Sequence, residues 1–187
     1  MKYLFVIYTD IEYKKHLDYF KKHKFYQQIC DDPKIEVIEW GTDFHTDYKN
    51  LPLKTYEMMK WCSENKEYDY LVKCDDTIVW RNDLANEFIY ENVNIFIHNE
   101  DYCGIKSRRF SYDGFYVDWY KDKGLGDLDK SLSEIATGDF YDGKCYVVSK
   151  EFSSFIGKQR GIAKMFSEKM SIEDVMVSFI YREMYSE

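Results

Sequence analysis

The sequence predicts an α/β fold built on a mixed, mostly parallel sheet flanked by helices. In the first half of the chain, short runs of β-branched and aromatic residues alternate with segments of helical periodicity. That alternation is typical of parallel sheets, because each helix carries the chain back to the edge where the next strand starts. The chain has 187 residues, 45% of them hydrophobic, with only 2 Pro and 9 Gly. We therefore expect residues 1–187 to form one domain with a full core and little linker.

The predicted strands are short apolar runs bounded by turn-forming or charged residues. Three of them lie in the first half of the chain, at Tyr3–Tyr8, Ile35–Trp40 and Tyr68–Cys74. Two more are expected at Ile95–His98 and Lys144–Ser149. A strand of a parallel sheet presents its carboxyl end to the ligand-binding side, so residues that follow these runs are candidates for a site.

The predicted helices are amphipathic segments between and after the strands. Glu12–Lys24 is polar with Leu17 and Phe20 on one side, which indicates a surface helix. Leu53–Asn65 and Ser171–Glu183 are the other two helices. Residues 99–140 are polar and aromatic with several glycines, and we expect them to be irregular. In the second helix four residues share one face: Thr55, Met58, Met59 and Cys62.

The charge of the chain limits its partners. The formal net charge is −8 and the sequence pI is about 5.1. This opposes a surface for nucleic acid or anionic lipid, because phosphate binding needs an excess of Lys and Arg. No apolar stretch is long enough to span a bilayer, and the first apolar run is too short for a signal peptide.

The five cysteines are odd in number and contain no C-x-x-C pair, which indicates free thiols in a reducing compartment. We therefore expect a cytoplasmic location, which for a viral protein is the cytoplasm of its host.

The most informative local feature is the acidic pair Asp75-Asp76, which follows the predicted strand Tyr68–Cys74. Adjacent carboxylates repel each other unless a positive group lies nearby. A divalent ion bound to a diphosphate would supply that charge, and carboxylate oxygens suit Mg²⁺ or Mn²⁺. The alternative is a solvated turn in which Asp75 caps the chain after the strand.

Two segments around this pair match a known family. Asp43–Thr55 reads D-F-H-T-D-Y-K-N-L-P-L-K-T. It resembles the D-F-x-D-x-Y-x-N-L-x-L-K-T signature of the β-1,3-galactosyltransferase, N-acetylglucosaminyltransferase and Fringe-like family (glycosyltransferase family thirty-one). Lys73–Thr77 lies at the distance where that family has a strand ending in K-x-D-D-D.

Later segments are similar to the same family in the same order. Phe140–Ser149 is similar to its Y-C-S-G-G-G-Y-V-L-S strand, and Ile172–Val177 to its E-D-V-x-V segment. Trp119-Tyr120 corresponds to its K-W-Y element. The resemblance therefore covers residues 43–181.

The resemblance implies a GT-A glycosyltransferase fold, a UDP-sugar donor and a metal ion, Mn²⁺ or Mg²⁺. It also implies an inverting transfer of a hexose or N-acetylhexosamine to a hydroxyl group of a glycan or protein. By resemblance, Asp174 is the catalytic base, and Asp75 and Asp76 hold the metal. A base takes the proton of the acceptor hydroxyl while the metal holds the departing UDP.

The residues expected to bind or position the donor lie in the matched segments. For the lysines the alternative is an ordinary surface charge. For Asp43, Asn50 and Thr55 the alternative is a purely structural role in the loop before the helix. Tyr116, Trp119 and Tyr120 offer an aromatic platform for a sugar, or simply core packing. The expected donor-binding set is Asp43, Asn50, Lys54, Thr55, Lys73, Asp75, Asp142 and Gly143.

Asp174 also has a purely structural interpretation. Ser171–Asp174 reads S-x-x-D, the pattern of a capping box at a helix start. In that position the helix dipole would stabilise the carboxylate and lower its basicity.

The chain departs from the family pattern at three points. Thr77 replaces the third Asp of D-D-D, a principal metal ligand in the family. Where the family has G-G-G before the Y-V-L-S strand, this chain has the single glycine Gly143. The four histidines all precede residue 99, so the family's late metal-binding His has no match. The alternatives are a catalytically impaired nucleotide-sugar-binding protein and a metal-dependent phosphoryl-transfer enzyme. The second lacks a glycine-rich phosphate loop.

Overall fold

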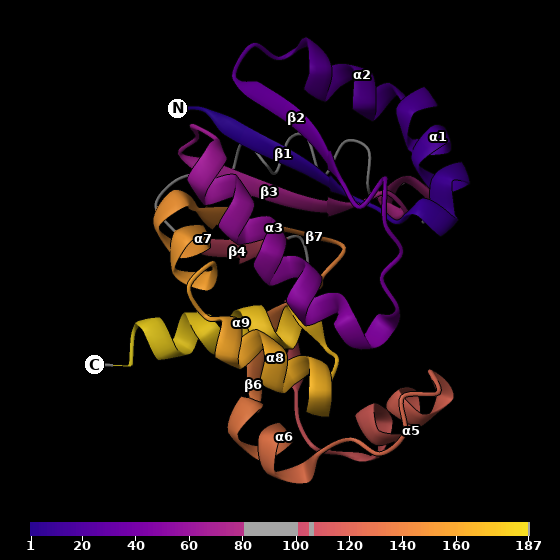
Figure 1. Cartoon of the computed structure of the whole chain (residues 1–187), viewed down its shortest axis with the longest axis vertical. Helices are drawn as coiled ribbons and strands as arrows, with labels where there is room; N and C mark the ends of the chain where they lie inside the picture. Colours follow the sequence, from indigo (N-terminus) through magenta and orange to yellow (C-terminus); the bar gives the residue numbers. More distant parts are fainter. Residues whose placement is uncertain (81–100, 105–106, 187) are drawn as a thin grey trace.

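A five-stranded sheet forms the centre of the fold (Figure 1). The computed structural model describes residues 1–80, 101–104 and 107–186. The strand order is β2-β1-β3-β7-β4; β1 is parallel to β2 and β3, and β7 is antiparallel to β3 and β4. Four of the five strands thus run in one direction, which confirms the predicted mixed, mostly parallel sheet. The strands are β1 (Tyr3–Tyr8), β2 (Ile35–Trp40), β3 (Tyr70–Asp75), β4 (Tyr102–Gly104) and β7 (Cys145–Ser149).

Two of the helices in the described part of the chain cover one face of this sheet. The chain leaves β1 through a short 3-10 helix, Ile11–Tyr13, and then forms α1 (Lys14–Lys22) and α2 (Lys24–Asp31). The helix predicted over Glu12–Lys24 is confirmed, with Leu17 and Phe20 buried, but α1 ends at Lys22 and the separate helix α2 was not predicted. His23 is extended, with ψ of 144°, and its side chain accepts a hydrogen bond from the amide of Phe25, so it ends α1 and caps α2.

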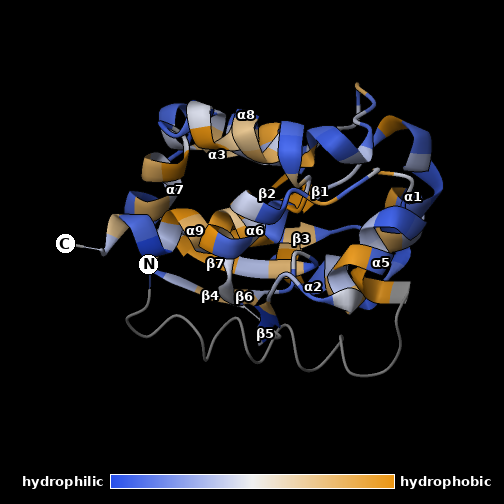
Figure 2. Ribbon diagram, turned by 90° about the horizontal axis from the view of Figure 1, so that it is seen from below, coloured by the Kyte–Doolittle hydropathy of each residue, from blue (hydrophilic) through white to orange (hydrophobic). Residues whose placement is uncertain are grey.

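Four other helices among the described residues cover the opposite face, and they bury the larger core cluster against β1, β3 and β7. The predicted face of α3 is confirmed, because its four residues are all fully buried. Figure 2 shows blue, hydrophilic segments on α8 and a largely orange α9. The helices are α3 (Leu51–Asn65), α7 (Lys150–Ile156), α8 (Arg160–Lys169) and α9 (Glu173–Met184).

The described part of residues 99–140 is largely regular, so the prediction of irregular structure is wrong there. It contains α5 (Gly114–Asp122) and α6 (Lys130–Ala136). Each of these helices starts at an aspartate, Asp113 or Asp129, whose carboxylate accepts from a backbone amide of the first turn. Around them, β5 (Ser107–Phe110) pairs antiparallel with β6 (Gly138–Tyr141) in a small second sheet.

The remaining predictions differ mainly at element ends. The strand expected at Ile95–His98 lies outside the described residues. Asp75 is the last residue of β3 rather than the residue after it. Within the described ranges, no helix combines the length and the apolar character needed to cross a membrane.

Candidate functional site

A cleft of about 950 Å³ opens at the carboxyl ends of β1 and β3. The ends of these strands, the turn between β6 and β7 and the start of α9 all contribute to its wall. Its charge is mixed but acidic: eight carboxylates and five Lys or Arg side chains are found among its described lining residues. The carboxylates are those of Asp10, Glu12, Asp47, Asp75, Asp76, Asp142, Glu173 and Asp174.

Lys73 lies at the centre of the charge network beneath the cleft. Its side chain is 2% exposed, and its Nζ lies 2.7 Å from Asp75 Oδ1 and 3.7 Å from Glu173 Oε2. The same ammonium donates to the carbonyl of Gly143 and lies 4.4 Å from the centre of the Tyr8 ring. Burial lowers the pKa of Lys73, but Asp75 and Glu173 outweigh this effect and raise the pKa above its usual value. The charged lysine therefore links β3, the β6–β7 turn and α9.

The acidic pair lines the cleft, as its position at a strand end predicts. Asp76 Oδ2 accepts a hydrogen bond of 2.5 Å from Thr9 Oγ1, and Asp75 accepts from Lys73. Burial raises the pKa of both carboxyl groups, even though Lys73 lowers that of Asp75. The carboxylate of Asp75 is thus held by an ion pair rather than exposed at a solvated turn.

The donor chemistry of Asp75 and Asp76 fits one mode of divalent-ion binding. Among the described residues, no group of three or more His, Cys, Asp or Glu side chains is arranged to hold a metal. These residues therefore do not form a site in which protein ligands alone surround the metal ion. Mg²⁺ is usually bound by one or two carboxylates together with substrate phosphates and water, and the pair can serve in that way.

Asp174 lines the cleft at the start of α9. Its Oδ2 accepts a hydrogen bond of 2.9 Å from the amide of Gly143, and its Oδ1 accepts from the amide of Val175. Burial and the nearby Glu173 raise the pKa of Asp174 to about 7. The expected lowering of its basicity by the helix dipole is therefore wrong, because burial away from water outweighs the dipole.

The predicted capping box is absent from the start of α9. The residue before the helix is Ile172, with no side-chain cap. Ser171 has a left-handed backbone, with φ of 56°, and its hydroxyl donates to the carbonyl of Ser167 in α8. The serine is turned toward the preceding helix and cannot cap α9.

Gly143 lies so close to the two carboxylates of α9 that any larger residue would require them to move. A Cβ at this position would lie 2.8 Å from Glu173 Oε2 and 3.3 Å from Asp174 Oδ2. The glycine lets the β6–β7 turn approach both carboxylates, so that its amide bonds Asp174 while its carbonyl bonds Lys73. The backbone at Gly143 therefore connects the acidic groups of α9 with the lysine of β3.

Asp142 lies in the same turn and is paired with a residue that the sequence analysis did not single out. Arg108 of β5 approaches it with Nη2 at 2.8 Å from Oδ2. Burial alone would raise the pKa of Asp142, but bonds from Lys144 and Arg108 hold the pKa below its usual value. Arg108 was missed because it lies in the stretch expected to be irregular.

Lys54 reaches the cleft from α3, but it contacts β1 rather than the acidic pair. Its Nζ donates to the carbonyl of Thr9 and lies 3.9 Å from Asp10 Oδ2. Gly41, with φ of 101°, makes room for it, since a Cβ there would lie 2.7 Å from the ammonium. Lys54 therefore lies closest to Asp10, and its charge also opposes the rise in the pKa of Asp75 and Asp76.

Asp10 and His45 form a second polar group at the cleft and were also missed. Asp10 Oδ1 lies 2.9 Å from His45 Nδ1, and its Oδ2 accepts from the amide of Thr46. Burial alone would raise the pKa of Asp10, but these bonds lower it. The signal was present in the sequence, because Asp10 follows the strand Tyr3–Tyr8 as Asp76 follows β3.

Three of the expected donor-binding residues do not line the cleft. Asp43 is exposed and borders no described part of it. Asn50 donates to Asp47 and lines a neighbouring groove instead. Thr55 is fully buried, with its hydroxyl 3.1 Å from Tyr8 Oη, and therefore connects α3 to β1.

The aromatic platform is divided between cleft and core. Tyr116 and Trp119 line the cleft. Tyr120 is 3% exposed, and its hydroxyl donates to Ser171. Two of the three aromatic residues can therefore face a ligand, while the third packs inside.

Comparison with known proteins agrees with the resemblance found in the motifs and extends it to the first strand. A family model described as Galactosyltransferase matches residues 1–185. A comparison with curated proteins finds no match. The family match covers every element that forms the cleft, from β1 through α9.

Proposed function

The chain belongs to the galactosyltransferase family and is a glycosyltransferase, and we propose that it transfers a hexose or N-acetylhexosamine from a UDP-sugar to a hydroxyl group with inversion. The acceptor is a glycan or a protein side chain. The observation that carries this proposal is the position of Asp174, a carboxylate with a raised pKa, in the same cleft as Asp75 and Asp76.

The donor's diphosphate is proposed to lie at Asp75 and Asp76. The cleft is acidic, so a diphosphate there needs an additional cation. We assign that role to Mn²⁺ or Mg²⁺ held by these two carboxylates. When bound, such an ion stabilises the charge that develops on the leaving diphosphate.

Asp174 is proposed to act as the general base. With a pKa of about 7, a substantial fraction of it is ionised at neutral pH, yet it is basic enough to take a proton. The acceptor hydroxyl gives its proton to Asp174 while its oxygen bonds to the anomeric carbon and the bond to UDP breaks. The hydrogen bond from Gly143 fixes the direction of the carboxylate during this step.

Two aromatic side chains that line the cleft, Tyr48 and Trp119, are proposed to hold a sugar ring. Tyr48 and Trp119 meet edge to face with ring centres 5.9 Å apart, and the ammonium of Lys123 lies within about 6 Å of both rings. Rings fixed in this way offer an apolar face at low entropic cost, which suits the C–H face of a hexose.

The experiment is UDP release from a panel of UDP-sugars, measured with Mn²⁺ and after its removal by chelation. We expect one UDP-hexose or UDP-N-acetylhexosamine to be turned over, and turnover to fall on chelation. Equal turnover after chelation would contradict the metal assignment. UDP binding by calorimetry without turnover of any donor would instead identify a sugar-nucleotide-binding protein.

A further inference from the structure

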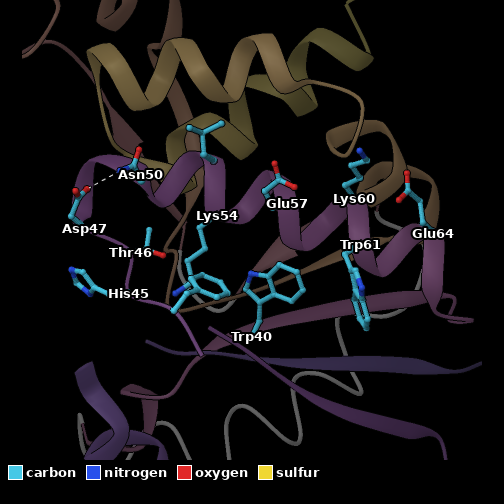
Figure 3. Close-up of a pocket in the computed structure, with 12 residues that line it drawn as sticks. Trp40, His45, Thr46, Asp47, Asn50, Lys54, Glu57, Lys60, Trp61 and Glu64 are labelled. Carbon is cyan, nitrogen blue, oxygen red and sulfur yellow. Dashed lines mark hydrogen bonds between the residues drawn. The ribbon is translucent and has the colours of Figure 1, made fainter. Parts of the chain in front are cut away.

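A second groove runs beneath α3 beside the cleft, and we call it the aromatic groove (Figure 3). It has a volume of about 620 Å³ and lies between the end of β2, the loop after it and α3. Four residues line both the groove and the cleft, so the two are continuous: His45, Thr46, Asp47 and Lys54.

Aromatic rings form the wall of this groove. Trp40 and Trp61 lie side by side below α3, with ring centres 5.7 Å apart and planes at 45°. Phe44 meets Trp40 edge to face at 6.3 Å. Trp61 and Phe44 are 39% and 38% exposed, well above the core aromatics. Large apolar rings open to solvent in a concave site are typical of ligand-binding grooves.

Polar side chains of α3 border the rings. Glu57, Lys60 and Glu64 lie one or two turns apart along α3 and line the groove, with Glu57 and Lys60 above the helix in Figure 3 and Trp61 below it. This stripe differs from the buried stripe of α3 that packs in the core. The groove therefore combines apolar rings and hydrogen-bonding side chains in its lining.

The indole of Trp40 carries a hydrogen-bond donor that lacks an acceptor among the described residues. Its Nε1 is buried and has no hydrogen-bond partner among the described residues. An unpaired buried donor costs free energy, since it has lost its water and gained no acceptor. A small shift of the rings toward a hydroxyl-bearing ligand, or of Glu57 in response to one, would supply the acceptor.

We infer that the aromatic groove binds a non-reacting part of a neutral oligosaccharide acceptor, and this inference rests on the proposed function. The acceptor's terminal hydroxyl lies in the cleft, and the chain of sugars continues through the shared residues onto Trp40 and Trp61. Sugar rings stack their C–H faces on the tryptophans, and their hydroxyls donate to Glu57 and Glu64.

The charges of the groove favour a neutral ligand over an anionic one. Asp47, Glu57 and Glu64 line it against two lysines, Lys54 and Lys60. The first lysine is 3% exposed and already engaged with Thr9 and Asp10. A phosphate or carboxylate in the groove would therefore meet three carboxylates, together with Lys60 and with Lys54 and His45, which are both paired with Asp10.

The test is calorimetric titration of the full chain with neutral tetrasaccharides of glucose, galactose or N-acetylglucosamine, in the absence of a donor. We expect at least one of them to bind, and Trp61→Ala to weaken that binding by about tenfold or more. Tyr112→Ala is the matched control, because Tyr112 is also 39% exposed and lines neither cavity. It is expected to leave the affinity unchanged.

A second variant guards against misfolding of the first. Glu57→Ala alters an exposed residue of the groove, and we expect it to weaken the same tetrasaccharide by several-fold. No binding of any tetrasaccharide, or equal binding by the wild type and both groove variants, would overturn the inference. So would UDP binding that Trp61→Ala abolishes, since the groove would then hold the nucleotide. Failure of the proposed function gives a different result, namely tetrasaccharide binding without turnover of any UDP-sugar.

Discussion

The Oδ2 atom of Asp174 lies 2.9 Å from the amide nitrogen of Gly143, which donates a hydrogen bond to it. This bond joins the first turn of α9 to the turn between β6 and β7. It fixes a carboxylate whose pKa burial raises to about 7. The direction of the base and its basicity therefore have separate causes: the backbone of Gly143 sets the first and the surrounding protein sets the second.

Replacing Asp174 by Asn is expected to reduce kcat by about 10² to 10⁴, the usual contribution of a general base. The wild-type rate should rise with pH through about 7, because only the ionised carboxylate accepts a proton. The variant should lose this rise and keep its affinity for UDP. Steady-state kinetics between pH 5.5 and 8.5, roughly the span around this pKa, and UDP calorimetry check both points. A variant that keeps the wild-type pH profile would contradict the assignment of the base.

Replacing Gly143 by Ala is expected to impair transfer and to destabilise the fold by about 1–3 kcal/mol, as overpacking does. The new Cβ would lie 2.8 Å from Glu173 Oε2 and would push both carboxylates of α9. Gly161→Ala is the control, since a Cβ there meets nothing within 4 Å. It should leave kcat unchanged and raise stability by up to about 1 kcal/mol, because Ala favours the helix. Denaturant unfolding and kinetics on both variants compare them directly.

Replacing Lys73 by Met is expected to destabilise the protein by about 3–5 kcal/mol, the range for breaking a buried ion pair. Asp75 and Glu173 would lose the cation that compensates their burial. Lys164→Met removes an exposed pair with Glu168, whose side chain is 60% exposed, and should cost about 1 kcal/mol or less. The measurement is urea unfolding. Equal losses in the two variants would show that the buried network does not hold these elements together.

Replacing Asp76 by Ala is expected to remove most of the increase in UDP affinity that Mn²⁺ produces, by about tenfold or more. Asp76 is one of the two proposed metal ligands, and its carboxylate also bonds Thr9. Asp43→Ala is the control, because Asp43 is exposed and does not line the cleft. Calorimetry with and without Mn²⁺ measures the difference. An Asp76→Ala variant that still responds fully to Mn²⁺ would place the metal elsewhere.

Periodicity predicted the sheet and α3 well because both are buried on a regular pattern. The strands at Tyr3–Tyr8 and Ile35–Trp40 have the predicted bounds. The break at His23 was missed, since it depends on a side-chain cap inside a continuous polar segment. The elements from β5 to β6 were missed because they are short, and the aspartate caps of α5 and α6 were not used as start signals.

The site was predicted where residues follow a strand or lie in a matched motif. Asp75, Asp76, Asp142, Gly143 and Asp174 all line the cleft. Long-range partners could not be found from spacing, because Arg108 of β5 pairs with Asp142 in the turn after β6, far along the chain. The pKa of Asp174 was also beyond the sequence, since local spacing gives the dipole of α9 but not the burial that overcomes it.

The stereochemistry of the product tests the central claim most directly. Once a donor and an acceptor are found, the product's anomeric configuration can be read from the proton coupling constant by NMR. A single displacement assisted by Asp174 predicts that the new bond has the opposite configuration to the bond in the UDP-sugar. A product with the donor's configuration would contradict the account, because it requires a different mechanism in this cleft.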